Sequence, residues 1–359
     1  MIKEKIKKYI AQDKIDIVDA LKMMDISGVG ILFIINDDEK LIGALTDGDV
    51  RRWLINTGNL DTEVIDIMGQ NPRYLHESDR MIANEYMLKN RIKAVPIVDN
   101  DCRIIDVIFN NKAFEENDES EIEKSLNDIP VIIMAGGKGT RLYPYTKILP
   151  KPLIPIGDIP IIERIINKFY KYGARDFWIT LNYKKEMIRS YFADIQPSYN
   201  VRYVEEDKPL GTAGSIRLIH KKFETPIIVT NCDILIEADY DKIMKYHIEK
   251  QNDMTVVSSL KNTVIPYGVL HTSEQGKINS IEEKPKLSYL VNTGMYVINP
   301  DIIKYIPRDI MFHMTDLAEK MLSMGMNVGM YPISEQAFLD MGEFGEMKKM
   351  EERINNGFE

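Results

Sequence analysis

A glycine-rich stretch in the middle of the chain carries the residue types that bind phosphate groups. It follows the apolar run 131–134, and its first six residues are Ala135, Gly136, Gly137, Lys138, Gly139 and Thr140. Glycines let the backbone approach a phosphate closely and point its N–H groups at it. Lys138 and, one residue after the six, Arg141 add positive charge. The stretch therefore predicts a phosphate-binding loop.

Two better-known glycine loops do not match this stretch. A P-loop requires Ser or Thr after its Gly-Lys pair, but Gly139 follows Lys138. The dinucleotide fingerprint requires a third Gly or Ala where Leu142 stands. On these residues alone, a turn that only connects a strand to the next element stays an alternative.

The elements that must position this loop alternate in type from Ile129 onward. Short apolar runs predict strands at 131–134, 177–181, 201–204, 227–230, 254–260 and 291–298. Helix-period segments predict helices at 161–172, 184–192, 215–221 and 240–250. This alternation predicts a doubly wound, Rossmann-like α/β domain with a mixed sheet. Ligands bind beyond the carboxyl ends of strands in such sheets, so the loops directly after strands are the candidate sites.

The glycine stretch and the segment Pro150-Lys151-Pro152 after it closely resemble the signature of sugar-phosphate nucleotidylyltransferases. The resemblance runs from about residue 130 to the end of the chain. It implies that a nucleoside triphosphate and a sugar 1-phosphate are joined with release of pyrophosphate. The two prolines hold the backbone around Lys151, so its ammonium is presented, and the resemblance places it at the α-phosphate. Arg141 would neutralise the triphosphate together with Lys151.

The segment 205–214 resembles the base-reading loop of these enzymes, which implies nucleotide contacts from Glu206, Gly211 and Thr212. Relatives that use pyrimidine nucleotides carry Gln where Glu206 stands. A carboxylate only accepts hydrogen bonds, and guanine offers adjacent N–H donors, so Glu206 favours GTP. The alternative is that Glu206 is one of several exposed acids.

The resemblance also implies a Mg²⁺ site and a sugar site. Asp233 and Asp340 match the metal-binding positions, and Mg²⁺ prefers one or two carboxylates together with phosphate oxygens. The two acids lie far apart in the sequence, so only the resemblance pairs them. The matched sugar-binding positions are Gly268, Glu283 and Asn292, with Lys284 at the sugar phosphate.

Two segments near the N-terminus, 28–52 and 93–114, resemble each other, which indicates one small unit used twice. In each copy a predicted helix comes first, at about 18–25 and 82–87, and an apolar strand, an acidic turn and a second strand follow. The pair resembles tandem CBS repeats, also called a Bateman module. The resemblance implies that Thr46 and Asp49 hold the ribose of an adenine nucleotide, with Arg51 facing a phosphate. A module that only packs and dimerises stays the alternative.

The second repeat departs from the CBS pattern. Phe109 stands where the Thr is expected, and Lys112 stands where the Asp is expected. At most one of the two ribose sites is therefore intact.

Acidic residues dominate the segment 115–128, which predicts a linker. The expected organisation is a tandem CBS module over 1–114, with repeats at about 1–66 and 67–114, then the linker, then the nucleotidylyltransferase domain over 129–359.

The composition excludes several classes of protein. The net charge of −9 argues against nucleic-acid binding. No apolar stretch approaches the roughly 20 residues that a membrane span needs, and the basic start lacks the apolar core of a signal peptide. Two cysteines exclude a disulfide framework and fit a cytoplasmic location.

A tandem CBS module joined to this type of domain resembles the glucosamine-1-phosphate guanylyltransferases of legionaminic acid biosynthesis. The resemblance implies GTP and glucosamine 1-phosphate as substrates, GDP-glucosamine as product, and a homo-oligomer formed through the CBS modules. Three alternatives stay open. They are a mannose-1-phosphate guanylyltransferase, a glucose-1-phosphate enzyme that uses another base, and a non-catalytic nucleotide sensor.

Overall fold

The computed structural model describes residues 4–110 and 125–355. The chain divides into two compact units, one formed by 1–121 with 260–291 and the other by 122–259 with 292–359. The expected linker, 115–128, lies outside the described residues as far as position 124. Leu126, near its end, is already buried in the core of the second unit. Within the described residues, no helix combines the length and the apolar character needed to cross a bilayer.

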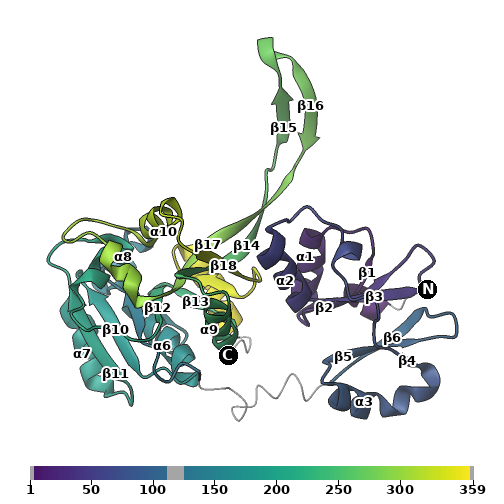
Figure 1. The fold of residues 1–359 in the computed structure, drawn as a ribbon, viewed down its shortest axis with the longest axis horizontal. Helices are drawn as coiled ribbons and strands as arrows, with labels where there is room; N and C mark the ends of the chain where they lie inside the picture. Colours follow the sequence, from purple (N-terminus) through teal and green to yellow (C-terminus); the bar gives the residue numbers. More distant parts are fainter. Residues whose placement is uncertain (1–3, 111–124, 356–359) are drawn as a thin grey trace. The chain divides into compact units, whose positions relative to one another are not determined.

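A seven-stranded mixed sheet runs through the second unit (Figure 1). The strands in spatial order are β11 (Asn200–Glu205), β10 (Asp176–Leu181), β7 (Val131–Met134), β12 (Ile227–Asn231), β17 (Lys286–Ile298), β14 (Met254–Val264) and β18 (Val328–Ile333). The first four are parallel to one another, and β17 is antiparallel to β12. The predicted α/β class with a mixed sheet is confirmed.

The order of the strands locates a ligand site. From β7 the chain adds β10 and then β11 on one side, and β12 then pairs with the other side of β7. The winding direction therefore reverses between β7 and β12. Because their carboxyl ends meet at the same edge of the sheet, the loops after β7 and β12 flank the crevice in which such sheets bind ligands.

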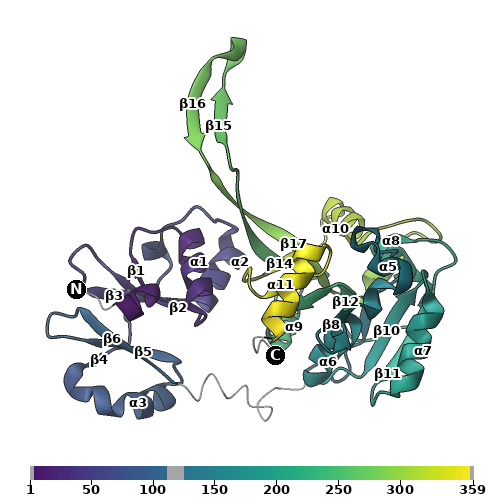
Figure 2. The same cartoon turned by 180° about the vertical axis from the view of Figure 1, so that it is seen from behind.

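Helical layers cover both faces of the sheet (Figures 1 and 2). Side chains alternate along β7, so that Val131 and Ile133 join one apolar cluster while Ile132 and Met134 join the other. The first cluster is covered by α6 (Ile161–Lys171), α7 (Lys185–Ile195), α9 (Tyr240–Glu249) and α11 (Phe344–Asn355). The second is covered by α10 (Met314–Ser323) and the 3-10 helices η6 (Ser215–Leu218) and η8 (Pro300–Tyr305).

The helix expected over 215–221 is shorter than predicted. Only η6 forms there, and it follows the single turn α8 (Gly211–Gly214). Lys221 lies beyond η6 and pairs with Asp176 on β10 at 2.9 Å. The segment after η6 is thus held against the sheet by a tertiary ion pair rather than by helical hydrogen bonds.

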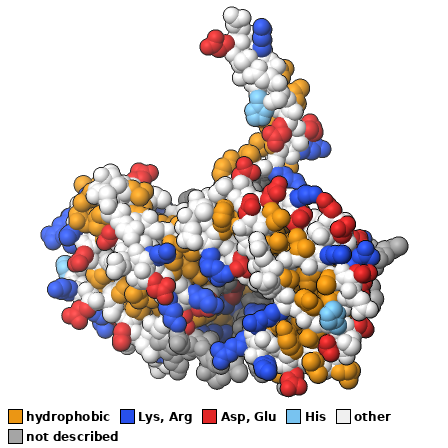
Figure 3. Space-filling model, turned by 45° about the vertical axis from the view of Figure 1, so that its right-hand side comes forward, with side chains coloured by type: hydrophobic (Ala, Val, Ile, Leu, Met, Phe, Trp, Pro, Cys, Tyr) orange, Lys and Arg blue, Asp and Glu red, His pale blue; other side chains and the backbone are white. Residues whose placement is uncertain are grey.

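A two-stranded hairpin, β15 (Gly268–Thr272) and β16 (Ile278–Glu283), belongs to the first unit. Every residue of β16 is exposed, and the side chains of the hairpin lie open on the surface (Figure 3). Gly268 and Glu283, expected as separate sugar-binding positions, are cross-strand partners in it.

The rest of the first unit shows the expected repeat. One three-stranded sheet contains β1 (Ile10–Gln12), β2 (Ile31–Ile35) and β3 (Leu41–Thr46), and the other contains β4 (Leu75–His76), β5 (Ala94–Val98) and β6 (Ile104–Phe109). β5 and β6 begin 63 residues after β2 and β3. Both sheets pair their strands in the same directions. The helices α1 (Ile17–Ser27) and α3 (Ala83–Asn90) precede the hairpins of the two repeats.

Thr46 and Asp49 have a structural role at the start of α2 (Asp47–Thr57). The backbone N–H of Thr46 donates to the Asp49 carboxylate at 2.9 Å, and the N–H of Asp49 donates to Thr46 Oγ1 at 3.3 Å. The pair forms a capping box, and Arg51 pairs with Asp47. In the second repeat the ring of Phe109 packs against Tyr9, with centroids 4.6 Å apart, while Lys112 lies outside the described residues.

Candidate active site

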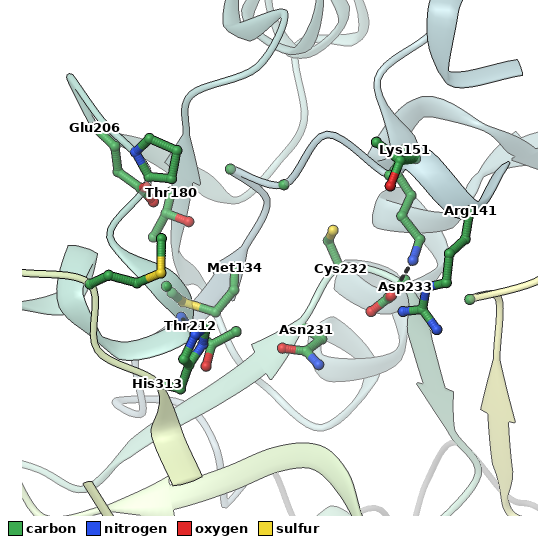
Figure 4. Close-up of a pocket in the computed structure, with 18 residues that line it drawn as sticks. Met134, Arg141, Lys151, Thr180, Glu206, Thr212, Asn231, Cys232, Asp233 and His313 are labelled. Atoms are coloured by element: carbon green, nitrogen blue, oxygen red, sulfur yellow. Dashed lines mark hydrogen bonds and ion pairs between the residues drawn. The ribbon is translucent and has the colours of Figure 1, made fainter. Parts of the chain in front are cut away.

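A pocket of about 420 Å³ lies over the carboxyl ends of β7 and β12 (Figure 4). All the residues that line it belong to the second unit. They come from segments far apart in the sequence: Gly136, Gly137 and Gly139–Arg141; Lys151; Thr180; Glu206, Pro209, Gly211 and Thr212; Asn231–Asp233; Met311 and His313; and Gly342, with Met134 at the base.

The glycine loop forms one wall of the pocket. Gly139 has φ +62°, and a side chain there would press on Thr146 and Lys151, so glycine is required. Thr146 Oγ1 donates to the carbonyl of Gly139 at 2.9 Å and holds the loop in place. Two of the residues expected to contact the nucleotide, Ala135 and Lys138, are not among the described lining residues. Ala135 is buried and donates its N–H to Thr180 at 3.1 Å, and Lys138 is exposed and outside the described lining.

Positive and negative charges meet at one end of the pocket (Figure 4). Lys151 begins the turn η5 (Lys151–Leu153) and is buried, and its ammonium forms an ion pair with Asp233. The exposed fractions of these two side chains are 10% and 17%. Arg141, in the turn η4 (Thr140–Leu142), lies beside the pair. Few water molecules therefore screen these charges, which strengthens their action on a bound anion.

A short antiparallel pairing brings the two predicted metal-binding acids together. β13 (Ile234–Ile236) pairs with β19 (Phe338–Asp340) so that Ile234 lies opposite Asp340. The N–H of Met341 donates to the carbonyl of Asp233 at 2.8 Å. Burial raises the pKa of the Asp340 carboxyl, and the charge of Asp233 raises it further. The neighbouring Lys151 and Arg141 act in the opposite direction.

These two carboxylates fit a divalent cation that also binds a phosphate. In the described part of the chain, no group of three or more His, Cys, Asp or Glu residues could hold a metal by itself. Mg²⁺ usually takes one or two carboxylates and completes its shell with water and phosphate oxygens. A bound cation would offset the negative charges of Asp233 and Asp340, whose proximity adds to the effect of burial in raising the pKa of Asp340.

Glu206 lies at the other end of the pocket from Lys151 (Figure 4). Its side chain is buried, so the alternative of an exposed acid is wrong. The carboxylate accepts the N–H of Leu210 at 3.2 Å and lies against Gly136, where a side chain would meet it at 2.9 Å. Burial raises the pKa of Glu206, and the hydrogen bond from Leu210 lowers it.

A segment that the sequence did not single out supports the loop beside Glu206. The N–H groups of Ala213 and Gly214 donate to the carbonyl of Phe312 at 2.9 and 3.1 Å. Gly211 has φ +78°, and a side chain there would overlap this carbonyl. Met311 and His313, on either side of Phe312, line the pocket. The capping box between His313 and Asp316 marks the start of α10 in the sequence, but nothing local places that start at the pocket.

The four predicted sugar-site residues are not among the described residues that line this pocket. Gly268 and Glu283 lie in the hairpin with Lys284 next to them, in the other unit. Asn292 lies in β17, donates to the Tyr296 hydroxyl at 2.6 Å and accepts the N–H of Gly294 at 2.9 Å. Their roles at a sugar stay a prediction.

Residues 130–356 match the family model described as nucleotidyl transferase. The chain belongs to the nucleotidyl transferase family. The predicted enzyme class is thereby confirmed for this nucleotidyl transferase domain. Residues 8–56 match the CBS domain model, which confirms the CBS resemblance for the first repeat.

The names of the relatives of this nucleotidyl transferase indicate nucleotides with different bases. The chain is 34% identical over 195 residues to a UTP–glucose-1-phosphate uridylyltransferase from Synechocystis and 31% identical over 183 residues to a mannose-1-phosphate guanyltransferase from Yarrowia lipolytica. Each match covers 49% of this chain and 50% of the relative, so the chain spans about half the length of these relatives. It is 35% identical over 174 residues, 48% of this chain and 76% of the relative, to a D-glycero-alpha-D-manno-heptose 1-phosphate guanylyltransferase from Campylobacter jejuni.

Solved structures resemble the nucleotidyl transferase domain as well. The crystal structure of HddC from Yersinia pseudotuberculosis has a TM-score of 0.50 and 26% identity, covering 63% of this chain and 99% of that one. A crystal structure of HddC complexed with GMP-PN has the same TM-score and coverage, with 28% identity.

Proposed function

We propose that the chain transfers a nucleotidyl group from a nucleoside triphosphate to a sugar 1-phosphate and releases pyrophosphate. The observation that carries this proposal is the pocket with two unlike ends. Lys151, Arg141 and Asp233 line one end beside the glycine loop, and Asp340 lies next to Asp233 outside the described lining. Glu206 lies at the other end. A nucleotide has the same asymmetry, with a triphosphate at one end and a hydrogen-bonding base at the other.

The reaction needs positioning and charge rather than a protein nucleophile. A phosphate oxygen of the sugar 1-phosphate attacks the α-phosphorus in line, and the bond from that phosphorus to the bridging oxygen of the pyrophosphate breaks. Both reactants are anions, so Arg141 and Lys151 lower the barrier by neutralising the triphosphate. A divalent cation held by Asp233 and Asp340, proposed to be Mg²⁺, would supply further positive charge to the phosphates.

We propose GTP as the nucleotide and glucosamine 1-phosphate as the acceptor. The buried carboxylate of Glu206 supports GTP, because it can accept hydrogen bonds from the N–H groups of guanine. The combination of a CBS module with this domain supports glucosamine 1-phosphate. The proposed sugar contacts are Gly268, Glu283, Asn292 and Lys284, and the proposed cellular location is the cytoplasm. Mannose 1-phosphate is the second candidate acceptor, because relatives include mannose-1-phosphate guanyltransferases.

A pyrophosphate-release assay tests this function. GTP, UTP, dTTP, ATP and CTP are each combined with the 1-phosphates of glucosamine, mannose, glucose and the manno-heptose. The highest rate is expected with GTP and glucosamine 1-phosphate. A higher rate with another pair replaces the proposed substrates but keeps the reaction. No release with any pair overturns the reaction and favours the nucleotide sensor.

Replacing Glu206 with glutamine is expected to weaken the preference for GTP over UTP by about tenfold or more. The reason is that the side chain facing the base changes from a carboxylate, which only accepts hydrogen bonds, to an amide, which both donates and accepts them. The measurement is kcat/KM for each nucleotide at one sugar 1-phosphate. Glu205→Gln is the matched control, because Glu205 is exposed and pairs with Lys185 and Arg189. An unchanged preference in Glu206→Gln would show that Glu206 does not read the base.

We propose that the CBS module binds one adenine nucleotide at Thr46, Asp49 and Arg51 and that it joins chains into a homo-oligomer. Titration calorimetry with AMP and with ATP is expected to show binding that Asp49→Ala abolishes. Asp49 also caps α2, so its loss costs about 1 kcal/mol of stability, and thermal unfolding must confirm a folded variant. Asp38→Ala, at an exposed acid in the same repeat, is the control. No heat from the wild type would favour the packing-only alternative.

A further inference from the structure

Asn231 is a polar residue that lines the pocket and whose side chain has no partner among the described residues. It ends β12, two residues before Asp233, and lines the pocket. Its side-chain amide makes no hydrogen bond with any residue in the part of the chain that the structure describes, whereas its backbone carbonyl accepts one from Thr230 Oγ1. In Figure 4 it lies between the end with Glu206 and the end with Asp233. An amide that lines a pocket without a protein partner is available to a ligand.

A glycine on the neighbouring strand determines where this amide points. Thr230 pairs with Met295, so Asn231 lies beside Gly294 of β17. Gly294 has φ +88°, and a methyl group added to it would overlap the Asn231 amide nitrogen. The backbone at Gly294 is also fixed by a hydrogen bond, because the Asn292 side chain accepts the N–H of Gly294 at 2.9 Å. Gly294 therefore gives the Asn231 amide the space that its present orientation needs.

The order of the strands separates Asn231 from the nucleoside. Glu206 follows β11 and the glycine loop follows β7, so a nucleotide with its base at Glu206 spans the edge from β11 to β7. β12 lies on the far side of β7. Asn231 ends β12, on the side of the glycine loop away from β11, and lies between Glu206 and the Lys151–Asp233 end of the pocket. An acceptor that approaches the α-phosphorus opposite to the departing pyrophosphate would enter on this side of the loop.

We propose that the Asn231 side chain hydrogen-bonds a hydroxyl group of the acceptor sugar. The inference rests on the proposed function and adds a residue to its acceptor site. A neutral amide carries both donors and an acceptor, which suits a hydroxyl group. The phosphates are served by cations, namely Lys151 and Arg141. Asn231 is therefore a residue that selects and orients the sugar.

The test is a comparison of Michaelis constants for the two substrates. With GTP and the sugar 1-phosphate that the wild type uses best, Asn231→Ala is expected to raise KM for the sugar 1-phosphate about tenfold or more, the scale of one lost polar contact. KM for GTP is expected to stay within about twofold, because the nucleotide keeps its contacts. A rise in KM for GTP alone would place Asn231 at the ribose and overturn the inference, as would unchanged constants for both substrates.

Gly294→Ala provides an independent variant that leaves Asn231 in the sequence. It is expected to raise KM for the sugar 1-phosphate by displacing the amide, but to add little in the Asn231→Ala background, where no amide is left to displace. Backbone strain from alanine at this φ lowers the melting temperature in both backgrounds, which separates strain from substrate binding. The inference would be contradicted if Gly294→Ala raised KM for the sugar 1-phosphate by the same factor in the Asn231→Ala background as in the wild type. No pyrophosphate release by the wild type would overturn the proposed function itself.

Discussion

Asp233→Asn is expected to slow pyrophosphate release by about a thousandfold or more, because a cation held at the phosphates stabilises the transition state by several kcal/mol. The substitution keeps the size of the side chain and removes its charge. It leaves Asp340 as the remaining acid of the pair and removes the ion-pair partner of Lys151. Binding of Mn²⁺ in the presence of GTP, followed by electron paramagnetic resonance, is expected to weaken in parallel.

The control for this variant is Asp207→Asn. Asp207 is exposed and is not among the described lining residues, so both its activity and its Mn²⁺ binding are expected to match the wild type. Asp340→Asn is expected to behave like Asp233→Asn. Wild-type activity in Asp233→Asn would remove this residue from the mechanism, and lost activity with intact Mn²⁺ binding would assign it a role other than metal binding.

Lys151→Met is expected to lower kcat by about a hundredfold or more, the usual effect of removing one group that stabilises transition-state charge. Methionine keeps most of the length of the side chain, so the buried space that Lys151 occupies stays filled. Steady-state kinetics with GTP and the preferred sugar 1-phosphate measure the change.

Lys147→Met is the matched control, because Lys147 belongs to the same stretch of chain but is exposed and outside the described lining. Thermal unfolding must show that Lys151→Met is folded, since the substitution leaves Asp233 without its ion pair in a half-buried position. If the folded variant kept its full kcat, Lys151 would have no role at the α-phosphate.

The parts of the fold that the sequence predicts are those with a local signal. The central strands β7 and β12 are mostly apolar runs, because a parallel strand covered on both faces favours apolar residues along most of its length. The glycine loop is visible because Gly139 adopts a left-handed conformation in contact with Lys151. The two repeats of the first unit can be recognised in the sequence, because both copies form the same antiparallel pair of strands, β2 with β3 and β5 with β6.

The parts of the site that have no local signal in the sequence depend on contacts between distant segments. No spacing rule joins Asp233 to Asp340, and it is the pairing of β13 with β19 that brings them together. Met311 and His313 line the pocket because the carbonyl of Phe312 binds the loop after Glu206. Gly268 and Glu283 are sequence motifs that only the hairpin turns into neighbours.

The divergence of the two repeats has a consequence for regulation. Where the first copy has Thr46 at the start of a helix, the second has Phe109, whose ring is committed to Tyr9. A ribose hydroxyl finds no hydrogen-bonding side chain at that equivalent position. If the module binds the adenine nucleotide proposed above, it would saturate at one nucleotide per chain, and a sigmoidal binding curve would require coupling between the chains of the proposed homo-oligomer.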